Sequence, residues 1–281
     1  MNTNNTKETI KELSISELRP FKGHPYRVVD DDEMDRLVES IEEHGVMTPI
    51  NVRPIEGGYE VISGHRRIHA AKRAGLTTIP AIEMGMTRDQ AAVALVDSNL
   101  HRERLLPSEK AFAYKLKMEA LAHQGTSRQV GEKWSVSKIS DDADESERQV
   151  HRYIRLTNLI PPLLRMVDEE RIAFTPAVEL SYLTQEEQEM LFTEIGVTLA
   201  TPSLSQACRL KRLSCEGKLN EEAIAAIMAE EKPNQREKVS IPMSSIGKYL
   251  PDAEPKRVQE FIIKACAFYK KHLQRIREEE R

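Results

Sequence analysis

The first hundred residues alternate short apolar runs with amphipathic stretches, which is the pattern of a small α/β unit. Strands are predicted at residues 10–15, 46–53, 59–63 and 77–84. Residues 31–44 carry apolar side chains at helical spacing, with acids in the first turn and Gly45 as a stop. A second helix is expected after Gly64, and Pro80 indicates an edge or a start for the last strand.

Residues 18–27 form a basic segment with two prolines, one glycine and no period, so they are predicted to be a loop. The simple interpretation is a connection between two elements. The functional interpretation is a flap over the turn at Gly64. The polar residues 1–9 look disordered.

From about residue 105 the pattern is purely helical. Pro107 begins a long helix that is expected to end at Gly125. Residues 127–158 are predicted to form a helix-turn-helix, whose second helix, residues 148–158, opens with a capping box at Ser146. Further helix starts are predicted at Thr175, Thr184 and Ser203.

The chain is therefore expected to be an α+β protein in three parts. These are an α/β domain, a helical domain with the helix-turn-helix, and a small C-terminal segment, at residues 10–104, 105–230 and 238–281. After a polar linker at residues 231–238, a short strand at 239–241 and a helix over 255–277 are expected. About forty residues are too few for a comfortable core, which favours docking or a strand-exchanged dimer.

Composition removes several classes of protein. The net charge of −4 means that any binding to nucleic acid must be local, and 5% aromatic residues disfavour a base-stacking platform. Cys208, Cys215 and Cys266 are too scattered for a disulfide framework or a zinc site, and the first two are expected in a core. With no apolar run of the ~20 residues that a membrane span needs and a polar start, no membrane association and a cytoplasmic location are expected.

The stretch from Val61 to Gly75 carries the clearest candidate chemistry. Gly64 lies between a strand and a helix, where the free N–H groups of the helix start favour an anion. Arg66 and Arg67 add guanidinium groups that match phosphate geometry. No acid lies between the strand and the end of the helix, so nothing local is expected to cancel the positive field. The alternative is a βα unit with two solvated arginines.

The predicted helix-turn-helix supplies a second set of candidates. In this motif the start of the second helix meets base edges and its flanks meet phosphate. Base contacts are expected from Arg148, Gln149 and Arg152. The full set of candidate DNA-binding residues is Lys138, Ser146, Arg148, Gln149, His151, Arg152 and Arg155. An ordinary capped helix in a bundle remains the alternative, and the acids within residues 141–147 count against close approach to the backbone there.

The order of these motifs resembles the ParB/RepB/Spo0J-type chromosome and plasmid partition proteins. Four motifs carry the resemblance: the turn from Val46 to Arg53, Gly-x-Arg-Arg at Gly64, Asn-Leu-x-Arg at Asn99, and the helix-turn-helix. It covers roughly residues 10–185. It implies binding of CTP with Mg2+, a palindromic site in double-stranded DNA, a homodimer that closes as a clamp, and a ParA-type ATPase as partner.

Carried over by motif, the resemblance implies one nucleotide site. Its residues would be Thr48, Pro49, Gly64, His65, Arg66, Arg67, Asn99 and Arg102, with Asn99 at the metal. Two departures concern hydrolysis, because His65 and Ser98 stand where the family has glutamates. Asp97 is one step away on a helix and is a doubtful substitute. We therefore expect at most a weak CTPase.

Two other functions stay open. A phosphotransfer enzyme or nuclease could use the same α/β unit, with His65 or His69 as general base or phosphate ligand. The absence of a carboxylate cluster beside Gly64 in the sequence weighs against it. A transcription regulator could use the same DNA-binding domain without a role in partition.

Overall fold

The computed structural model describes residues 9–100, 102, 105–123, 128–230 and 261–272, without the side chains of residues 128–134. The chain divides into two compact units, residues 1–230 and 231–281. The second unit is described only as a helix over residues 261–272, so the predicted strand at 239–241 lies outside the described residues. The predicted boundary at residues 104/105 stays a prediction.

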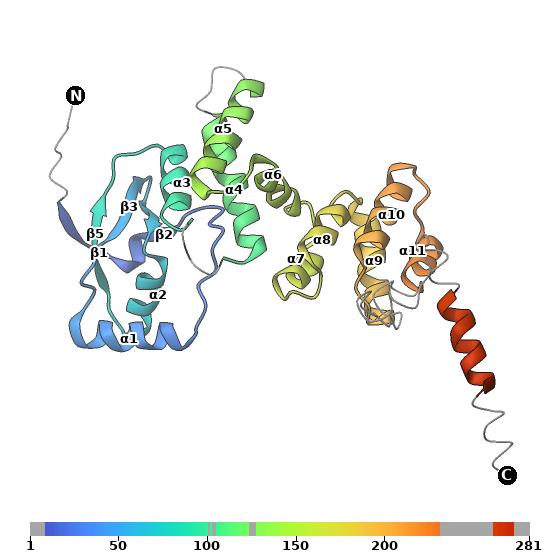
Figure 1. Cartoon of the computed structure of the whole chain (residues 1–281). Coiled ribbons are helices and arrows are strands. Elements are labelled where there is room, and N and C mark those ends of the chain that lie inside the picture. The colour runs from blue at the N-terminus through green and yellow to red at the C-terminus, as the bar shows by residue number, and fades with distance from the viewer. Residues whose placement is uncertain (1–8, 101, 103–104, 124–127, 231–260, 273–281) are drawn as a thin grey trace, which may run out of the picture. The chain divides into compact units, whose positions relative to one another are not determined.

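Five strands form one mixed sheet in the order β1-β5-β3-β4-β2 (Figure 1). They are β1 Ile10–Ser14, β2 Leu18–Pro20, β3 Ile50–Ile55, β4 Gly58–Ser63 and β5 Thr78–Glu83. A short 3-10 turn, Ile15–Glu17, joins the two edge strands. The hairpin β3–β4 and the pair β1–β5 are antiparallel, whereas β3–β5 and β2–β4 are parallel.

Two expectations about this sheet were wrong. The segment predicted as a loop from residue 18 begins with the edge strand β2. Of the two positions that Pro80 was expected to indicate, the edge is wrong, because β5 pairs with both β1 and β3 inside the sheet. Pro80 is tolerated there because the parallel pairing with β3 begins only at Ala81, one residue later.

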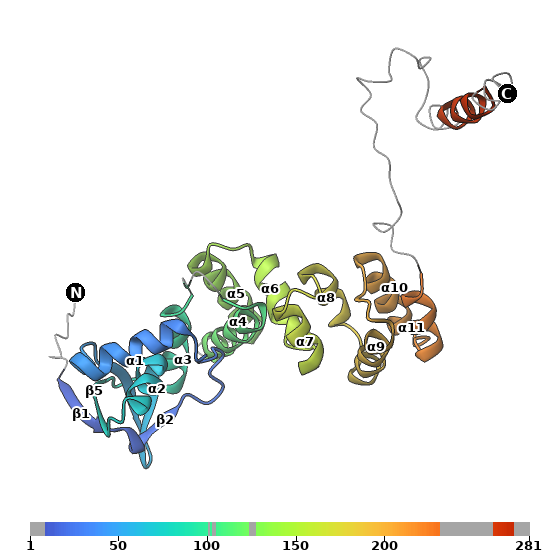
Figure 2. The same cartoon turned by 90° about the horizontal axis from the view of Figure 1, so that it is seen from below.

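Neighbouring residues of a strand point to opposite sides of a sheet. Both faces of this sheet carry apolar side chains, so helices pack against both. Val61 belongs to the core under α2, His65–Arg73, whereas Ile62 belongs to the core under α3, Arg88–Asp97. Helix α1, Asp32–His44, is capped by Asp31 and packs its apolar stripe against α2 (Figure 2). The α+β fold class is confirmed.

The rest of the first unit is helical. Its members are α4 Pro107–Ala122, α5 Arg128–Ala143, α6 Glu147–Leu156, α7 Pro161–Asp168, α8 Phe174–Leu180, α9 Gln185–Thr198, α10 Leu204–Cys215 and α11 Glu221–Met228. Helix α6 packs Val150 against Ile139 of α5. None of the helices in the described part of the chain is long and apolar enough to cross a membrane.

Three details of this region differ from expectation. Helix α8 begins at Phe174, one residue before the predicted start at Thr175, and Ala173 occupies its cap position. Cys208 and Cys215 are exposed rather than in a core. Ser146 caps α6, but no capping box forms, because the side chain of Gln149 bonds to Arg152 rather than to the backbone N–H of Ser146.

Candidate functional site

The turn at Gly64 is fixed by internal packing. Gly64 has φ +104°, a left-handed conformation that favours glycine, and it occupies the cap position of α2. A Cβ added there would lie 2.5 Å from Cγ2 of Ile50, whose side chain is fully buried. No side chain caps the helix, so the N–H groups of its first turn face outward from the strand end.

Three separated segments line a cavity of about 210 Å3 above this turn. They are the predicted flap, the strand-to-helix turn, and the chain after α3. The lining residues are His24, Tyr26, Arg27, Val28, Ser63, Gly64, His65, Arg66, Arg67, Ser98, Asn99 and Arg102. An adjoining hollow of about 590 Å3 shares Arg27, Arg66 and Arg102 with it. Six of the eight residues predicted for a nucleotide site therefore lie together.

Thr48 and Pro49 take another position. Their carbonyl oxygens each accept a hydrogen bond of 2.5 Å from Nη1 of Arg67, so they orient this guanidinium rather than line the cavity. Burial lowers the pKa of Arg67. Because both carbonyls act on the same nitrogen, Arg67 is held in place before any anion arrives.

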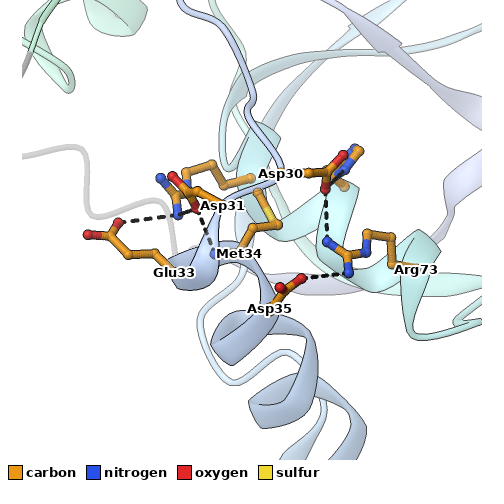
Figure 3. A network of polar contacts seen from close by, with 8 residues as sticks. Asp30, Asp31, Glu33, Met34, Asp35 and Arg73 are labelled. Carbon is orange, nitrogen blue, oxygen red and sulfur yellow. Dashed lines mark hydrogen bonds and ion pairs between the residues drawn. The ribbon is translucent and has the colours of Figure 1, made fainter.

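Arg66 is held by carboxylates from α1. Its Nη2 lies 3.5 Å from Oδ1 of Asp31 and 3.4 Å from Oε2 of Glu33 (Figure 3). The expectation that nothing local cancels the positive field was therefore wrong. The compensating acids come from the start of another helix, more than thirty residues earlier in the chain.

The same acidic helix start continues along α2. Asp30 lies 2.8 Å from Nε2 of His69 and 2.8 Å from Nη1 of Arg73, and Asp35 lies 2.7 Å from Nη2 of Arg73 (Figure 3). These contacts lower the pKa of Asp30, chiefly through the His69 hydrogen bond, and raise that of Arg73. His69 is thus occupied outside the cavity lining.

Two histidine rings lie close together, tilted to one another, in the cavity lining. The ring centroids of His24 and His65 are 3.8 Å apart, and Nε2 of His65 is buried with no hydrogen-bond partner among the described residues. Burial, followed by the nearby His24 and Arg102, lowers the pKa of His65 to about 3. Burial also lowers the pKa of His24. His65 is therefore neutral at pH 7, and a pKa near 3 is poorly matched to general-base chemistry at that pH.

The chain after α3 adds amide and guanidinium groups. Nδ2 of Asn99 donates to the carbonyl of Leu95 at 2.8 Å and to Oγ of Ser98 at 3.1 Å, which leaves its amide oxygen to interact elsewhere. Arg102 lies 5.9 Å from the ring centre of Tyr26 in the flap. Asp97 binds Lys117 and does not line the cavity, so it does not replace the glutamate expected at Ser98.

The donor set does not fit a magnesium ion held by protein alone. Magnesium is usually bound through carboxylates together with phosphate oxygens and water. The cavity lining contains no carboxylate, and no cluster of three or more His, Cys, Asp or Glu suited to a metal occurs among the described residues. Asn99 offers one neutral oxygen only.

The flap is anchored to the helical region, a feature missed from the sequence. The backbone N–H of Arg27 donates to Glu109 at 2.8 Å, and its Nη2 donates to Asp168 at 3.0 Å. Asp168, nearly buried, also accepts from the N–H and the hydroxyl of Ser108. Only the basic character of the flap signalled Arg27, because its partners lie 82 and 141 residues away.

Apart from Lys138 on α5, the predicted DNA-binding residues separate into two groups at α6. Arg148 and His151 are exposed, and Ser146 accepts a hydrogen bond from the N–H of Gln149 at 3.2 Å. The side chain of Gln149 accepts from Arg152 at 3.0 Å instead of returning to the cap. Lys138 is partly buried on α5. The exposed start of α6 is thus available to a partner.

The second group faces α8. Arg152 donates to Oγ1 of Thr175 at 2.9 Å. Arg155 donates to the carbonyl of Ser181 at 3.3 Å and lies 3.8 Å from the ring centre of Tyr182. These arginines bind neighbouring helices in this structure, which weakens their assignment to DNA.

Comparison with known proteins agrees with this arrangement. Residues 1–100 match the family model described as the ParB N-terminal domain. The chain is 39% identical over 109 residues to Stage 0 sporulation protein J of Bacillus subtilis, covering 39% of each chain. It is 32% identical over 186 residues to the probable chromosome-partitioning protein ParB of Helicobacter pylori, covering 66% of this chain and 60% of that one. It thus spans 39% to 60% of the length of these relatives.

Solved ParB structures also match. C-terminally truncated ParB from Caulobacter crescentus, complexed to the centromeric parS site, is 23% identical, with 72% of this chain and 98% of that chain covered and a TM-score of 0.42. The same protein complexed with CTP-γ-S is 25% identical, with 66% and 98% covered and a TM-score of 0.32.

The fold and the site define a class: a small α/β domain with an arginine-lined cavity at a strand-to-helix turn, continued by a helical region with a helix-turn-helix. Within that class, residues 1–100 match the ParB N-terminal domain, and the chain is similar to ParB-type partition proteins over part of their length. The resemblance predicted from the sequence is confirmed.

Proposed function

We propose that this chain is a sequence-specific DNA-binding partition protein whose cavity binds CTP as a switch ligand. The observation that carries the proposal is the convergence of the flap, the Gly64 turn and the chain after α3 on one arginine-lined cavity. The adjoining hollow is lined by Glu109 of α4, the helix that precedes the helix-turn-helix formed by α5 and α6. A ligand in the cavity would touch all three segments at once.

The cavity suits a polyphosphate. Arg27, Arg66 and Arg102 line both the cavity and the adjoining hollow, so phosphate groups in the cavity could meet several cationic groups. Asp31, Glu33 and Glu109 also line the hollow, so the cavity itself, whose lining has no carboxylate, is the better place for an anion. The first-turn N–H groups of α2 add to this field. The preference for the cytosine base rests on the family resemblance. Magnesium, if present, would be held mainly by the nucleotide's own phosphates, with the Asn99 oxygen as the protein's contribution.

Hydrolysis is expected to be slow or absent. His65, which is neutral, stands where the family has its first glutamate. Ser98 stands at the position of the second glutamate, and its hydroxyl donates to the carbonyl of Leu95. Neither supplies a carboxylate to activate water. The phosphotransfer alternative loses support for the same reason, and because His69 is paired with Asp30 outside the lining.

The DNA arm of the proposal rests on α6. Arg148 and His151 are exposed in the first half of α6 and Gln149 is half-buried between them, in the part of the helix that reads base edges in this motif. Binding to a palindromic site by a homodimer, action with a ParA-type ATPase and a cytoplasmic location follow from the family resemblance. Whether the site serves partition or transcription depends on where it lies in the genome.

Calorimetric titration tests the nucleotide arm. Wild-type protein should bind CTP in preference to ATP, GTP and UTP, and Arg66→Ala should lose most of that affinity. Arg73→Ala is the matched control, because Arg73 shares the acidic network of α1 but does not line the cavity. Binding of no nucleotide, with or without DNA, would refute the switch.

Selection of binding sites from random duplexes tests the DNA arm. Gln149→Ala should relax specificity at one base pair, with a loss of about 1–3 kcal/mol on the selected site. Lys138→Ala should weaken all duplexes alike and flatten the salt dependence. An equal loss on selected and random DNA for Gln149→Ala would remove it from the base-reading set.

A further inference from the structure

A fully buried lysine joins the two halves of the first unit. Lys117 lies in the middle of α4 with none of its side chain exposed. Its ammonium group binds Asp97, the last residue of α3, and lies 2.6 Å from Oδ2 of Asp142, near the end of α5. One cation is thus shared by carboxylates from two different helices.

The burial of this ammonium group makes both contacts consequential. A charged amine taken out of water is costly unless it is paired, and loss of a partner leaves that cost uncompensated. The two carboxylates are partly exposed, at 46% and 39% of their side-chain surface, so either can be solvated if its helix moves. The ammonium group of Lys117 is fully buried and cannot be solvated in this way, so its pairing depends on the positions of both α3 and α5.

Each end of this ion triad lies beside one proposed site. Asp97 directly precedes Ser98 and Asn99, which line the cavity. Asp142 lies on the helix whose Ile139 packs against Val150 of α6. A shift of the chain at Asn99 on ligand binding acts on the Asp97 contact, whereas a shift of α5 on DNA binding acts on the Asp142 contact.

We propose that Lys117 is a positioning residue that couples the nucleotide cavity to the helix-turn-helix. The inference rests on the proposed function and adds to it the residue through which the two sites influence each other. Because binding free energies are linked, the factor by which CTP changes DNA affinity equals the factor by which DNA changes CTP affinity. If Lys117 couples the two sites, removal of the triad lowers both factors together.

The test measures that mutual effect in the full chain. Calorimetry gives the affinity for CTP with and without a selected duplex, and the affinity for the duplex with and without CTP. Wild type should show a ratio within the roughly 5- to 150-fold range typical of coupled sites. Lys117→Met should keep both separate affinities while the ratio falls toward one. Lys115→Met is the matched control, on the same helix and without an ion pair among the described residues.

Two further variants keep the inference open to refutation. If Lys117→Met does not fold, Asp142→Asn retains the Asp97 pair and should still lower the ratio. A merely structural lysine would reduce both affinities and leave the ratio unchanged, which would overturn the inference while leaving the proposed function intact. A wild type that binds no CTP would instead refute the proposed function, and the inference with it.

Discussion

Gly64→Ala is the substitution whose cost can be worked most directly from the structure. The residue has φ +104°, and its new Cβ would lie 2.5 Å from Cγ2 and 3.0 Å from Cβ of Ile50. Ile50 is fully buried in the central strand β3, so it cannot turn away into solvent. The neighbour that must give way is therefore the core itself.

Two costs add at this position. A non-glycine residue in a left-handed conformation costs about 1–2 kcal/mol, and overpacking a well-filled core costs about 1–3 kcal/mol. Alanine restricts the unfolded chain more than glycine does, which adds about 0.4–1 kcal/mol back to the free energy of unfolding. Gly64→Ala should therefore lower the free energy of unfolding by about 1–4.5 kcal/mol.

Urea unfolding followed by circular dichroism measures this loss, and two other glycines separate its causes. Gly75→Ala, at φ +76° with open space around it, should show the conformational cost alone. Gly85→Ala, in open space without a left-handed φ, should be close to neutral. If Gly64→Ala costs no more than Gly75→Ala, the close approach to Ile50 does not constrain the turn and the reasoning is wrong.

Further predictions concern pH, charge and stability. Burial lowers the pKa of His65 from 6.5 to about 3, so as the pH falls the unfolded chain binds this proton before the folded protein does. The contribution of His65 to the free energy of unfolding should be complete above pH 6.5 and fall by about 1.4 kcal/mol per pH unit between pH 6.5 and about pH 3. His65→Gln should flatten that slope in urea unfolding at pH 7 and 5, and an unchanged slope would contradict the assignment. Asp31→Asn keeps a good helix cap and removes one of the two carboxylates paired with Arg66, so titration should show CTP affinity raised by up to about fivefold, as expected for an exposed pair, whereas Asp35→Asn should leave it unchanged. Arg155→Ala should lower the melting temperature without changing the selected DNA sequence; a changed sequence would add Arg155 to the residues that read bases.

Features that depend on nearby residues were predicted well from the sequence. The helix starts predicted at Thr184 and Ser203 are confirmed, because each is fixed by a capping box, a pair of hydrogen bonds within four residues. The stop at Gly45 and the turn at Gly64 are likewise local, since both depend on backbone conformations that glycine favours.

Features that depend on distant residues could not be predicted. The acids that pair with Arg66 come from α1, and neither their position nor their orientation follows from any local pattern. Lys117 looks like a solvated residue in an ordinary helix, yet it is fully buried, because its partners arrive from α3 and α5. The order of motifs indicated the nucleotide site, whereas the anchoring of Arg27 by Asp168 required the fold.

Amide hydrogen exchange with and without CTP tests the central claim most directly, because it locates the ligand on the chain. The account predicts that CTP gives its largest protection in three segments together, residues 24–28, 64–67 and 98–102, with little change across α9 to α11. Protection absent from all three segments, or confined to one of them, would contradict the claim that they form a single nucleotide site.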